Sequence, residues 1–311
     1  MHKTFKSPNS IWLTRENGRY TISFCYEDDL NESNLFNTQK HLDHLRGSSR
    51  EELESITVGI DRGVTRPVQA GKSYFDFTKE QKNKKKRKEK YIRRCQKALA
   101  KKIKGSKRRN RAKRKISKVY KKIANIRKDF CHKTSHSIVN NKDTKVIVLE
   151  DLKTYQMTKK PKAKKDENGK WKKNNRKSKA GLNKSILDKG WHLIECFLKY
   201  KAYRAGKALF KIAAHYTSQE CSDCGYTHPD NRKKSKFLCG KCSNADHADE
   251  NAEKVIKKRA INLILDSGTE LSKRGVLLDK GRGAIYKTRC ATANRAHSTE
   301  TSKKKEMAIS A

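Results

Sequence analysis

Short apolar runs separated by polar turns predict the first strands of the chain. Apolar and aromatic residues alternate with polar ones over 20–24, residues 11–13 are apolar, and Asn17-Gly18 lies in the connection between the runs 11–15 and 20–24. This pattern predicts a β-hairpin. A second pair of short strands is predicted around 67–70 and 74–77.

Two further strands are predicted to end on an acidic residue. The β-branched run 56–60 is followed at once by Asp61, and the run 145–149 is followed by Glu150. The second run is continuously apolar after its lysine, which is typical of a strand buried on both faces. Both acids are therefore expected at strand tips.

Apolar residues at helical spacing predict a helical hairpin within 82–133. The periodic residues form two sets on either side of Gly105-Ser106, namely Ile92, Cys95, Leu99 and Ile103, then Ile116, Val119, Ile123, Ile126 and Phe130. At about 1.5 Å per residue, a helix over 82–104 is roughly 35 Å long. Another helix is predicted to open near residue 246 with Asp249 in its first turn, where the helix dipole favours an acid.

Charge changes this picture, because the 311-residue chain is strongly cationic. It has 77 Lys and Arg against 33 Asp and Glu, a net charge of +44, and only 34% apolar residues. Nucleic acid is the commonest polyanion that relieves such an excess, through counterion release. An anionic membrane surface competes as a partner, but no apolar run could span a bilayer and the first residues lack a signal-peptide pattern. We therefore expect a soluble, cytoplasmic protein.

Most of the excess charge lies in two segments of different character. Residues 82–128 contain 25 Lys and Arg and a single acid, Glu89, on the predicted hairpin. Residues 159–179 contain 11 Lys and Arg against two acids, with no apolar periodicity. A solvated helical face normally mixes both signs, so the first segment favours polyanion binding. The second predicts a basic flexible loop that orders on a partner or stays disordered.

Four of the nine cysteines form a metal-ligand pattern. Cys221 and Cys224 make one C-x-x-C pair, and Cys239 and Cys242 make a second pair 14 residues later. Two such knuckles can close a tetrahedral zinc site, and because the protein supplies all four ligands the zinc is structural. Two disulfides would need an oxidising compartment, and a redox C-x-x-C would need only one pair. His228 is expected to be a surface turn residue, not a further ligand.

Three carboxylates at the ends of predicted elements indicate a second metal site. Asp61 and Glu150 follow strands and Asp249 opens a helix, so a sheet can bring them to one edge. Three such carboxylates can hold two divalent cations about 3.5–4 Å apart for phosphodiester hydrolysis. Oxygen-only ligands favour Mg²⁺ or Mn²⁺ over zinc. Each acid alone fits an ordinary structural role, but the set beside a basic hairpin and a zinc pattern favours the metal site.

Five ordered blocks of the sequence resemble the signature of the TnpB (OrfB) family of transposon-encoded, RNA-guided DNA nucleases, which are similar to the ancestors of type V CRISPR effectors. The blocks are residues 59–64, 147–152, 182–186, 216–221 and 247–252, and they surround the four-cysteine pattern. The resemblance covers the chain from about Ser55 to Ser267.

The resemblance implies a fold and a domain order. The fold class is α/β, an RNase H-like (RuvC) mixed sheet with flanking helices, a long basic helical hairpin insertion and a four-cysteine zinc ribbon insertion. The implied segments are a remnant of a wedge-type β domain (1–55), the first part of the RuvC-like domain (56–217, with the hairpin 82–133 and the loop 157–181), the zinc ribbon (218–245), the last part of the RuvC-like domain (246–290) and a disordered tail (291–311).

The resemblance also implies partners and a catalytic site. Asp61, Glu150 and Asp249 would be the catalytic residues and would bind Mg²⁺ or Mn²⁺. A guide RNA from the transposon end would direct cleavage of DNA paired to it, beside a short motif. The hairpin and the loop fit a channel that holds the guide–target duplex by its backbone. The resemblance further implies that the protein is prokaryotic and is associated with the nucleoid in the cytoplasm.

Two features depart from the family pattern. Only 60 residues precede Asp61, where the family usually carries a longer part with a wedge barrel and a helical recognition domain. That part is expected to read the target-adjacent motif and to grip the RNA scaffold, and residues 11–24 look like the last wedge strands. The second departure is Glu253, where an alanine commonly follows Asn251-Ala252.

Two hypotheses from different classes follow. The leading one is an RNA-guided, divalent-metal-dependent DNA endonuclease that works by a two-metal mechanism. The alternative is an N-terminally truncated, catalytically idle nucleic-acid-binding relic or regulator of the same family, which the short N-terminus favours and the intact triad opposes. A ribosome-associated zinc-ribbon protein would leave the three acids unexplained, and nothing in the sequence argues for the strand transfer of a DDE-type transposase.

Overall fold

The computed structural model describes residues 7–16, 19–26 and 39–279, so the predicted tail 291–311 and residues 280–290 lie outside the described residues. The chain divides into two compact units. One takes Met1–Leu35, Arg62–Asn141 and Lys153–Gly206, and the other takes Phe36–Asp61, Lys142–Leu152 and Lys207–Ala311. No described helix has the length and apolar character needed to cross a membrane.

The second unit is built on three parallel strands. They are β3 (Thr57–Asp61), β6 (Val146–Glu150) and β7 (Ala208–Ile212). Strand β6 pairs with both of the others. Every residue of β6 and of β7 is buried, so the prediction of a strand covered on both faces is confirmed for β6.

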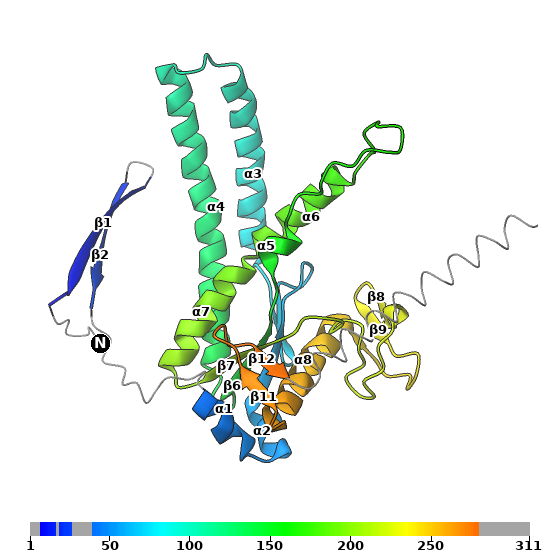
Figure 1. Ribbon diagram of the computed structural model, residues 1–311. Coiled ribbons are helices and arrows are strands. Elements are labelled where there is room, and N and C mark those ends of the chain that lie inside the picture. The colour runs from blue at the N-terminus through cyan, green and yellow to red at the C-terminus, as the bar shows by residue number, and fades with distance from the viewer. Residues whose placement is uncertain (1–6, 17–18, 27–38, 280–311) are drawn as a thin grey trace, which may run out of the picture. The chain divides into compact units, whose positions relative to one another are not determined.

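Helices α1 (Gln39–Arg46), α2 (Arg50–Ile56) and α8 (Ala248–Leu265) pack with these strands (Figure 1). The apolar core between them includes Leu53, Phe210 and Ile256. Helix α2 leads straight into β3, so the strand predicted over 56–60 begins one residue later and Ile56 ends the helix. A short hairpin of β11 (Thr269–Leu271) and β12 (Leu277–Asp279) completes this part of the unit.

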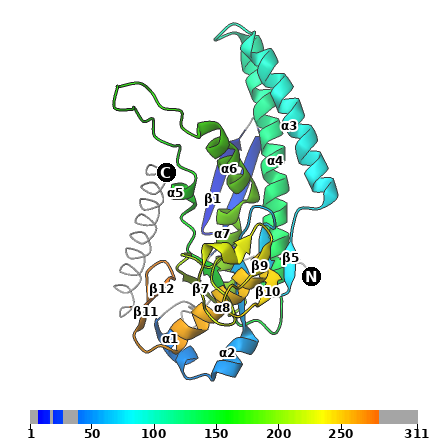
Figure 2. The same ribbon diagram turned by 90° about the vertical axis from the view of Figure 1, so that its right-hand side faces the viewer.

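A small three-stranded antiparallel sheet follows β7 in the same unit. Its strands are β8 (Arg232–Lys233), β9 (Lys236–Leu238) and β10 (Ala245–His247), preceded by the 3₁₀ turn Pro229–Asn231. Phe237 forms its core together with Cys221, Cys239 and Ala248. Strands β9 and β10 lie beside the start of α8, so the ribbon is anchored to that helix (Figure 2).

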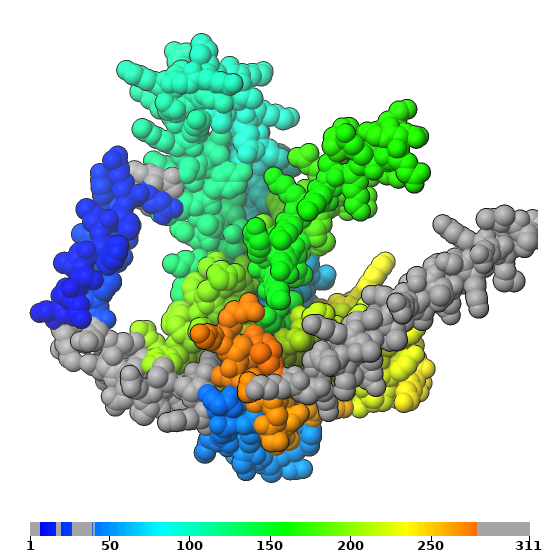
Figure 3. All heavy atoms as spheres, in the orientation of Figure 1, coloured from blue at the N-terminus to red at the C-terminus, as the bar shows by residue number. Residues whose placement is uncertain are grey.

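The first unit is dominated by a long helical hairpin. Helices α3 (Lys79–Ala100) and α4 (Lys107–Val139) lie side by side in both ribbon views and form a column in the space-filling view (Figure 3). A capping box of Thr78 and Gln81 starts α3, and Gly105, with φ +84°, turns the chain between the helices. Ile92, Ile116 and Ile123 pack between them, which confirms the predicted hairpin.

Helices α5 (Thr154–Met157), α6 (Arg176–Lys189) and α7 (Trp191–Arg204) complete the helical part of this unit, and α7 packs on α4. Asp188 at the end of α6 accepts from Lys85 Nζ at 2.5 Å and from Arg127 Nη2 at 3.1 Å. Burial of Asp188 opposes its ionisation, but these two cations outweigh burial and lower its pKa.

The loop predicted over 157–181 is shorter in the structure, because α6 begins at Arg176. The remaining segment contains one antiparallel bridge between Lys165 and Trp171 around the turn at Gly169. The sequence pattern did not predict the start of α6, because the first turn of this helix contains no apolar residue. The other end of α6 is held by the ion pairs of Asp188 with α3 and α4.

Two β-hairpins belong to the first unit, and both were predicted. Strands β1 (Ser10–Glu16) and β2 (Arg19–Cys25) pair antiparallel, as do β4 (Val68–Ala70) and β5 (Ser73–Phe75). The protein thus combines parallel and antiparallel strands with flanking helices, a basic helical hairpin and a four-cysteine ribbon. The predicted α/β fold class is confirmed.

Candidate active site

Two of the predicted catalytic carboxylates lie on neighbouring strand ends. Strands β3 and β6 are parallel with Ile60 opposite Leu149, and Asp61 and Glu150 are the next residues on each strand. Asp61 is 9% exposed and Glu150 is 5% exposed. The expectation that both acids sit at strand tips therefore agrees with the structure, which also shows that the two strands are neighbours.

The direction of α8 brings the third acid to the same end. Glu253, near the start of α8, accepts from the backbone N–H of Gly59 at 3.0 Å. Asn262, near its end, accepts at 2.9 Å from Arg50, which precedes β3. Helix α8 therefore runs antiparallel to β3, and its first turn lies toward the end of β3 that carries Asp61.

Asp249 stands in that first turn and is 5% exposed. The turn begins after His247, whose Nδ1 accepts from the backbone N–H of Asp249 at 3.2 Å. This cap satisfies one of the N–H groups that a helix start leaves without an intrahelical partner. The capped and buried first turn of α8 thus holds the backbone of Asp249 in place.

The close approach of α8 to β3 depends on Gly59. A Cβ at this position would lie 2.4 Å from the carbonyl oxygen of Glu253 and 3.0 Å from the backbone nitrogen of Lys257. Both neighbours are backbone atoms of a packed helix, so neither can turn aside. The glycine two residues before Asp61 therefore sets the distance between the helix and the strand.

Two neighbours of the carboxylates were not foreseen from the sequence. The Thr217 hydroxyl donates to Glu150 Oε1, and Arg232 Nη2 donates to Asp249 Oδ1 at 2.9 Å. Thr217 lies in the block 216–221, which carries the family resemblance, and this was the one feature of the sequence that pointed to it. Arg232 lies on β8 of the ribbon, and no periodic pattern links it to α8.

The donor set fits a hard divalent cation. All three groups are nearly buried carboxylates at one edge, and oxygen ligands of this kind suit Mg²⁺ or Mn²⁺. Within the described part of the chain, only the four cysteines bring three or more possible ligand atoms within 4.8 Å of one another. The three carboxylates therefore do not all lie within that distance of one another.

The four cysteines fit structural zinc. Sγ of Cys221 lies 3.6 Å from that of Cys242, and Sγ of Cys224 lies 3.6 Å from that of Cys239. Four sulfurs around zinc at about 2.3 Å would lie roughly 3.8 Å apart. Desolvation opposes ionisation of Cys239, but backbone N–H donors of Cys242 and Lys241 outweigh it and lower its pKa to about 6.

His228 is not a member of the cysteine cluster. Its Nδ1 accepts from the backbone N–H of Asp230 at 3.2 Å and caps the short 3₁₀ turn. The predicted turn role of this histidine is confirmed.

Two exposed aromatic rings, one on α5 and one in the basic loop, lie beside lysines. Trp171 is 68% exposed with Lys165 Nζ 4.9 Å from its ring centre, and Tyr155 is 79% exposed with Lys159 Nζ at 5.3 Å. Solvent-facing rings flanked by cations are typical of surfaces that stack on nucleic-acid bases.

Comparison with protein families gives two matches in separate parts of the chain. A family model described as "Probable transposase" (OrfB_IS605) matches residues 24–161, and one described as "Cas12f1-like, TNB domain" matches residues 191–256. The first match contains Asp61 and Glu150, and the second contains the four cysteines and Asp249.

Individual relatives agree with these matches. The chain is 36% identical over 202 residues to "Putative RNA-guided DNA endonuclease InsQ" of Escherichia coli K12, covering 64% of this chain and 48% of that protein. It is 29% identical over 145 residues to "TnpB-like protein aq_aa05" of Aquifex aeolicus, covering 44% and 42%. The chain thus spans about half the length of these relatives.

Among solved structures, a cryo-EM structure of a Cas12f1–sgRNA–target DNA complex is similar with a TM-score of 0.43 and 18% identity. The similarity covers 80% of this chain and 56% of that one.

Proposed function

The comparisons confirm the resemblance of this chain to the TnpB (OrfB) family, and on that premise we propose that it is an RNA-guided, divalent-metal-dependent DNA endonuclease. The observation that supports the proposal is the position of three acids: Asp61 and Glu150 at the ends of paired strands, and Asp249 in the first turn of α8, which is hydrogen-bonded to β3. All three carboxylates are nearly buried. Holding three like charges together away from water is costly, and bound divalent cations would offset that cost.

When bound, two divalent cations would activate a water and stabilise the leaving oxygen of a phosphodiester. The residues of this chain supply the rigid cradle. Asp61 and Glu150 are held by the ends of paired strands, and the Thr217 hydroxyl orients the Glu150 carboxylate. Arg232 places a cation beside Asp249, which offsets part of the mutual repulsion of three acids.

The zinc ribbon has a structural part in this proposal. Its four thiolate ligands leave no open coordination position, so zinc would hold the ribbon and take no part in hydrolysis. Asn251 of α8 accepts from the backbone N–H of Ser222 at 3.0 Å and so ties the ribbon to the catalytic helix. The ribbon also carries Arg232 to the carboxylate edge.

The partners proposed are a guide RNA and the DNA paired to it. Their support is the charge of the helical hairpin, 25 Lys and Arg against one acid over 82–128, together with the exposed rings of Tyr155 and Trp171. Such a surface can hold a duplex by its backbone while base pairing reads the sequence.

The proposal is tested by purifying the full chain from a host that carries its transposon, sequencing the bound RNA, and offering DNA matched to that RNA. Magnesium-dependent cleavage of matched DNA, with scrambled DNA left intact, is the expected result. Bound RNA without cleavage of any matched DNA would instead support the catalytically idle binding protein. Cleavage of matched and scrambled DNA at equal rates would contradict guidance by RNA.

A further inference from the structure

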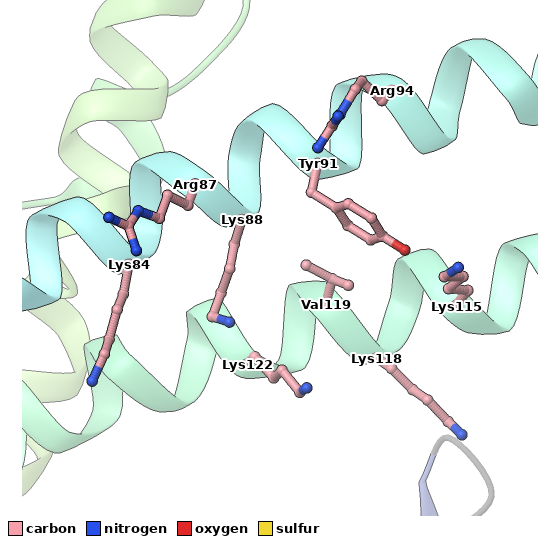
Figure 4. Close-up of a pocket in the computed structure, with 9 residues that line it drawn as sticks. All are labelled: Lys84, Arg87, Lys88, Tyr91, Arg94, Lys115, Lys118, Val119 and Lys122. Carbon is pink, nitrogen blue, oxygen red and sulfur yellow. The ribbon is translucent and has the colours of Figure 1, made fainter.

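A groove between α3 and α4 is lined almost entirely by cations. It encloses about 640 Å³ and seven of its nine lining residues are Lys or Arg. The lining residues are Lys84, Arg87, Lys88, Tyr91 and Arg94 from α3 and Lys115, Lys118, Val119 and Lys122 from α4. Figure 4 shows that side chains from both helices border one opening. We call this feature the cation groove.

The cation groove has like charges on both of its walls. Lys84 and Lys88 reach from α3 toward α4, and Lys122 lies on the facing wall (Figure 4). Like charges that face each other across the two helices repel. None of the nine lining residues is acidic, and the ion pair that Lys84 forms with Glu80 is solvent-exposed. An anion between the walls would relieve this repulsion.

The other side of the same hairpin is built differently. The pocket there contains Glu89 and Asp188, and α6 covers it. Lys184 pairs with Glu89 at 3.2 Å, and Arg127 pairs with Asp188 at 3.1 Å. Acids of the protein itself thus lie among the cations on that side, whereas the lining of the cation groove contains no acid. Among the described residues, the exposed pair of Lys84 with Glu80 is the one ion pair that the groove cations form.

The shape of the cation groove indicates what kind of anion it takes. The lining residues of α3 recur at helical spacing from Lys84 to Arg94, which is about 15 Å along the helix at 1.5 Å per residue. One nucleic-acid strand advances about 3.4 Å along the axis per phosphate, so this length matches roughly four phosphates. Cations on two facing walls suit a single row of phosphates lying between them.

Tyr91 and Val119 give the cation groove an apolar floor. The Tyr91 ring lies 5.6 Å from Lys115 Nζ and 5.9 Å from Arg94 Cζ, measured to the ring centre. A hydrogen bond with the Tyr91 hydroxyl raises the pKa of Lys115, which keeps that lysine charged. An aromatic ring between cations can pack on a sugar or a base without selecting a sequence.

We infer that the cation groove binds one row of about four phosphodiesters, with Tyr91 packed against the sugars or bases of the same strand. The inference deepens the proposed function and rests on it, since it assigns the strand contact to residues of α3 and α4. The row of phosphates can come from a guide–target hybrid or from an unpaired strand.

The test compares two variants that lose the same charge. The groove variant carries Arg87→Gln, Lys88→Gln and Lys122→Gln. The control variant carries Lys86→Gln, Lys90→Gln and Lys97→Gln, three exposed lysines of α3 that do not line the groove. Both are made in the full chain with Glu150→Gln, so that cleavage cannot consume the probe. The probes are a fluorescent RNA, a DNA of the same sequence, and their hybrid of about 20 base pairs.

The expected result is a difference in salt dependence. Three lost phosphate contacts lower the slope of log K against log salt by roughly 2.7 on a duplex and about 2.1 on a single strand. Affinity of the groove variant then falls on the order of 100-fold at about 0.1 M salt, while the control variant changes only a few-fold. Tyr91→Leu weakens binding about tenfold with the slope unchanged, and Tyr91→Phe keeps most of the affinity.

The probe that shows the loss identifies the strand. A loss on the hybrid assigns the groove to the guide–target duplex, and a loss on RNA or DNA alone assigns it to an unpaired strand. Equal slopes for the groove and control variants on every probe would overturn the inference. The binding assay does not depend on cleavage, so its result would stand even if the protein proved to be an inactive nuclease. If the protein cleaves DNA but the groove and control variants have equal salt slopes, the role of the cation groove is refuted and the proposed nuclease function is not.

Discussion

The replacement Gly59→Ala probes the contact that joins β3 to α8. The added methyl group would lie 2.4 Å from the Glu253 carbonyl oxygen, whereas ordinary contacts of a Cβ begin at 3.4 Å. Relief of this overlap requires α8 to move about 1 Å away from the strand, because the opposing atoms are backbone. The same movement strains the hydrogen bond from Gly59 N–H to Glu253, which is 3.0 Å long.

The cost follows from these two effects. Overpacking a close-packed core costs about 1–3 kcal/mol, and weakening a buried hydrogen bond costs about 1–3 kcal/mol more. The lower backbone entropy of alanine in the unfolded chain offsets roughly 0.5–1 kcal/mol. We therefore expect Gly59→Ala to lower the free energy of unfolding of this unit by about 2–4 kcal/mol, a large part of the stability of a typical domain.

Hydrogen exchange of peptides from β3 and α8 is the suitable assay, because all three tryptophans lie in segments of the other unit. Faster exchange across both elements is expected in Gly59→Ala. Gly181→Ala is the matched control, because Gly181 lies within α6 and no atom comes within 4 Å of the position that the added methyl group would take. The control should stabilise its helix by about 0.5–1 kcal/mol.

Exchange across β3 and α8 that is as slow in Gly59→Ala as in the wild type would contradict this prediction. That result would mean that the helix does not pack on the strand at the distance described. Because Asp61 and Asp249 lie on these two elements, the variant should also lose DNA cleavage. Normal cleavage with faster exchange would show that the site tolerates the 1 Å shift.

Two further predictions concern other parts of the chain. Lys85 and Arg127 outweigh the effect of burial and lower the pKa of Asp188. The ion pairs of Asp188 therefore stabilise the fold fully at pH values above the ordinary carboxyl pKa, and this stabilisation is lost as the pH falls through the lowered pKa of Asp188. Asp188→Asn should cost about 1–3 kcal/mol in urea unfolding at neutral pH, followed by tryptophan fluorescence, and a difference that persists in strong acid would contradict the ion pairs. Cys239→Ser should abolish zinc binding, measured by zinc release with a colorimetric chelator. The matched control Cys196→Ser changes an exposed cysteine outside the cluster and should keep the zinc. Equal zinc content in both variants would contradict a four-cysteine site.

Local sequence patterns were sufficient for the features that depend on neighbouring residues. The run before Glu150 is apolar without interruption because β6 is buried on both faces, so strand and acid could be placed together. The two C-x-x-C pairs identified the four cysteines that form one cluster in the structure, since knuckle spacing is set by coordination geometry. The helical hairpin was predictable because Ile92, Ile116 and Ile123 recur at helical spacing and pack on one another.

Features that depend on contacts between distant residues were not visible in the sequence. Arg232 reaches Asp249 only because the ribbon packs beside the start of α8. Glu253 stood out as a departure from the family pattern, but its bond to the Gly59 N–H exists only once α8 lies on β3. The start of α6 was missed because tertiary ion pairs at Asp188, not an apolar stripe, secure that helix.

The central claim is that Asp61, Glu150 and Asp249 form a cation-binding site that cuts DNA. Its most direct test is the rate of magnesium-dependent cleavage of matched DNA by the RNA-bound wild type and by Asp61→Asn, which keeps the shape of the side chain and removes its charge. We expect cleavage by Asp61→Asn to fall by at least about 10³-fold while DNA binding changes less than a few-fold. Cleavage by Asp61→Asn at the wild-type rate would contradict the central claim.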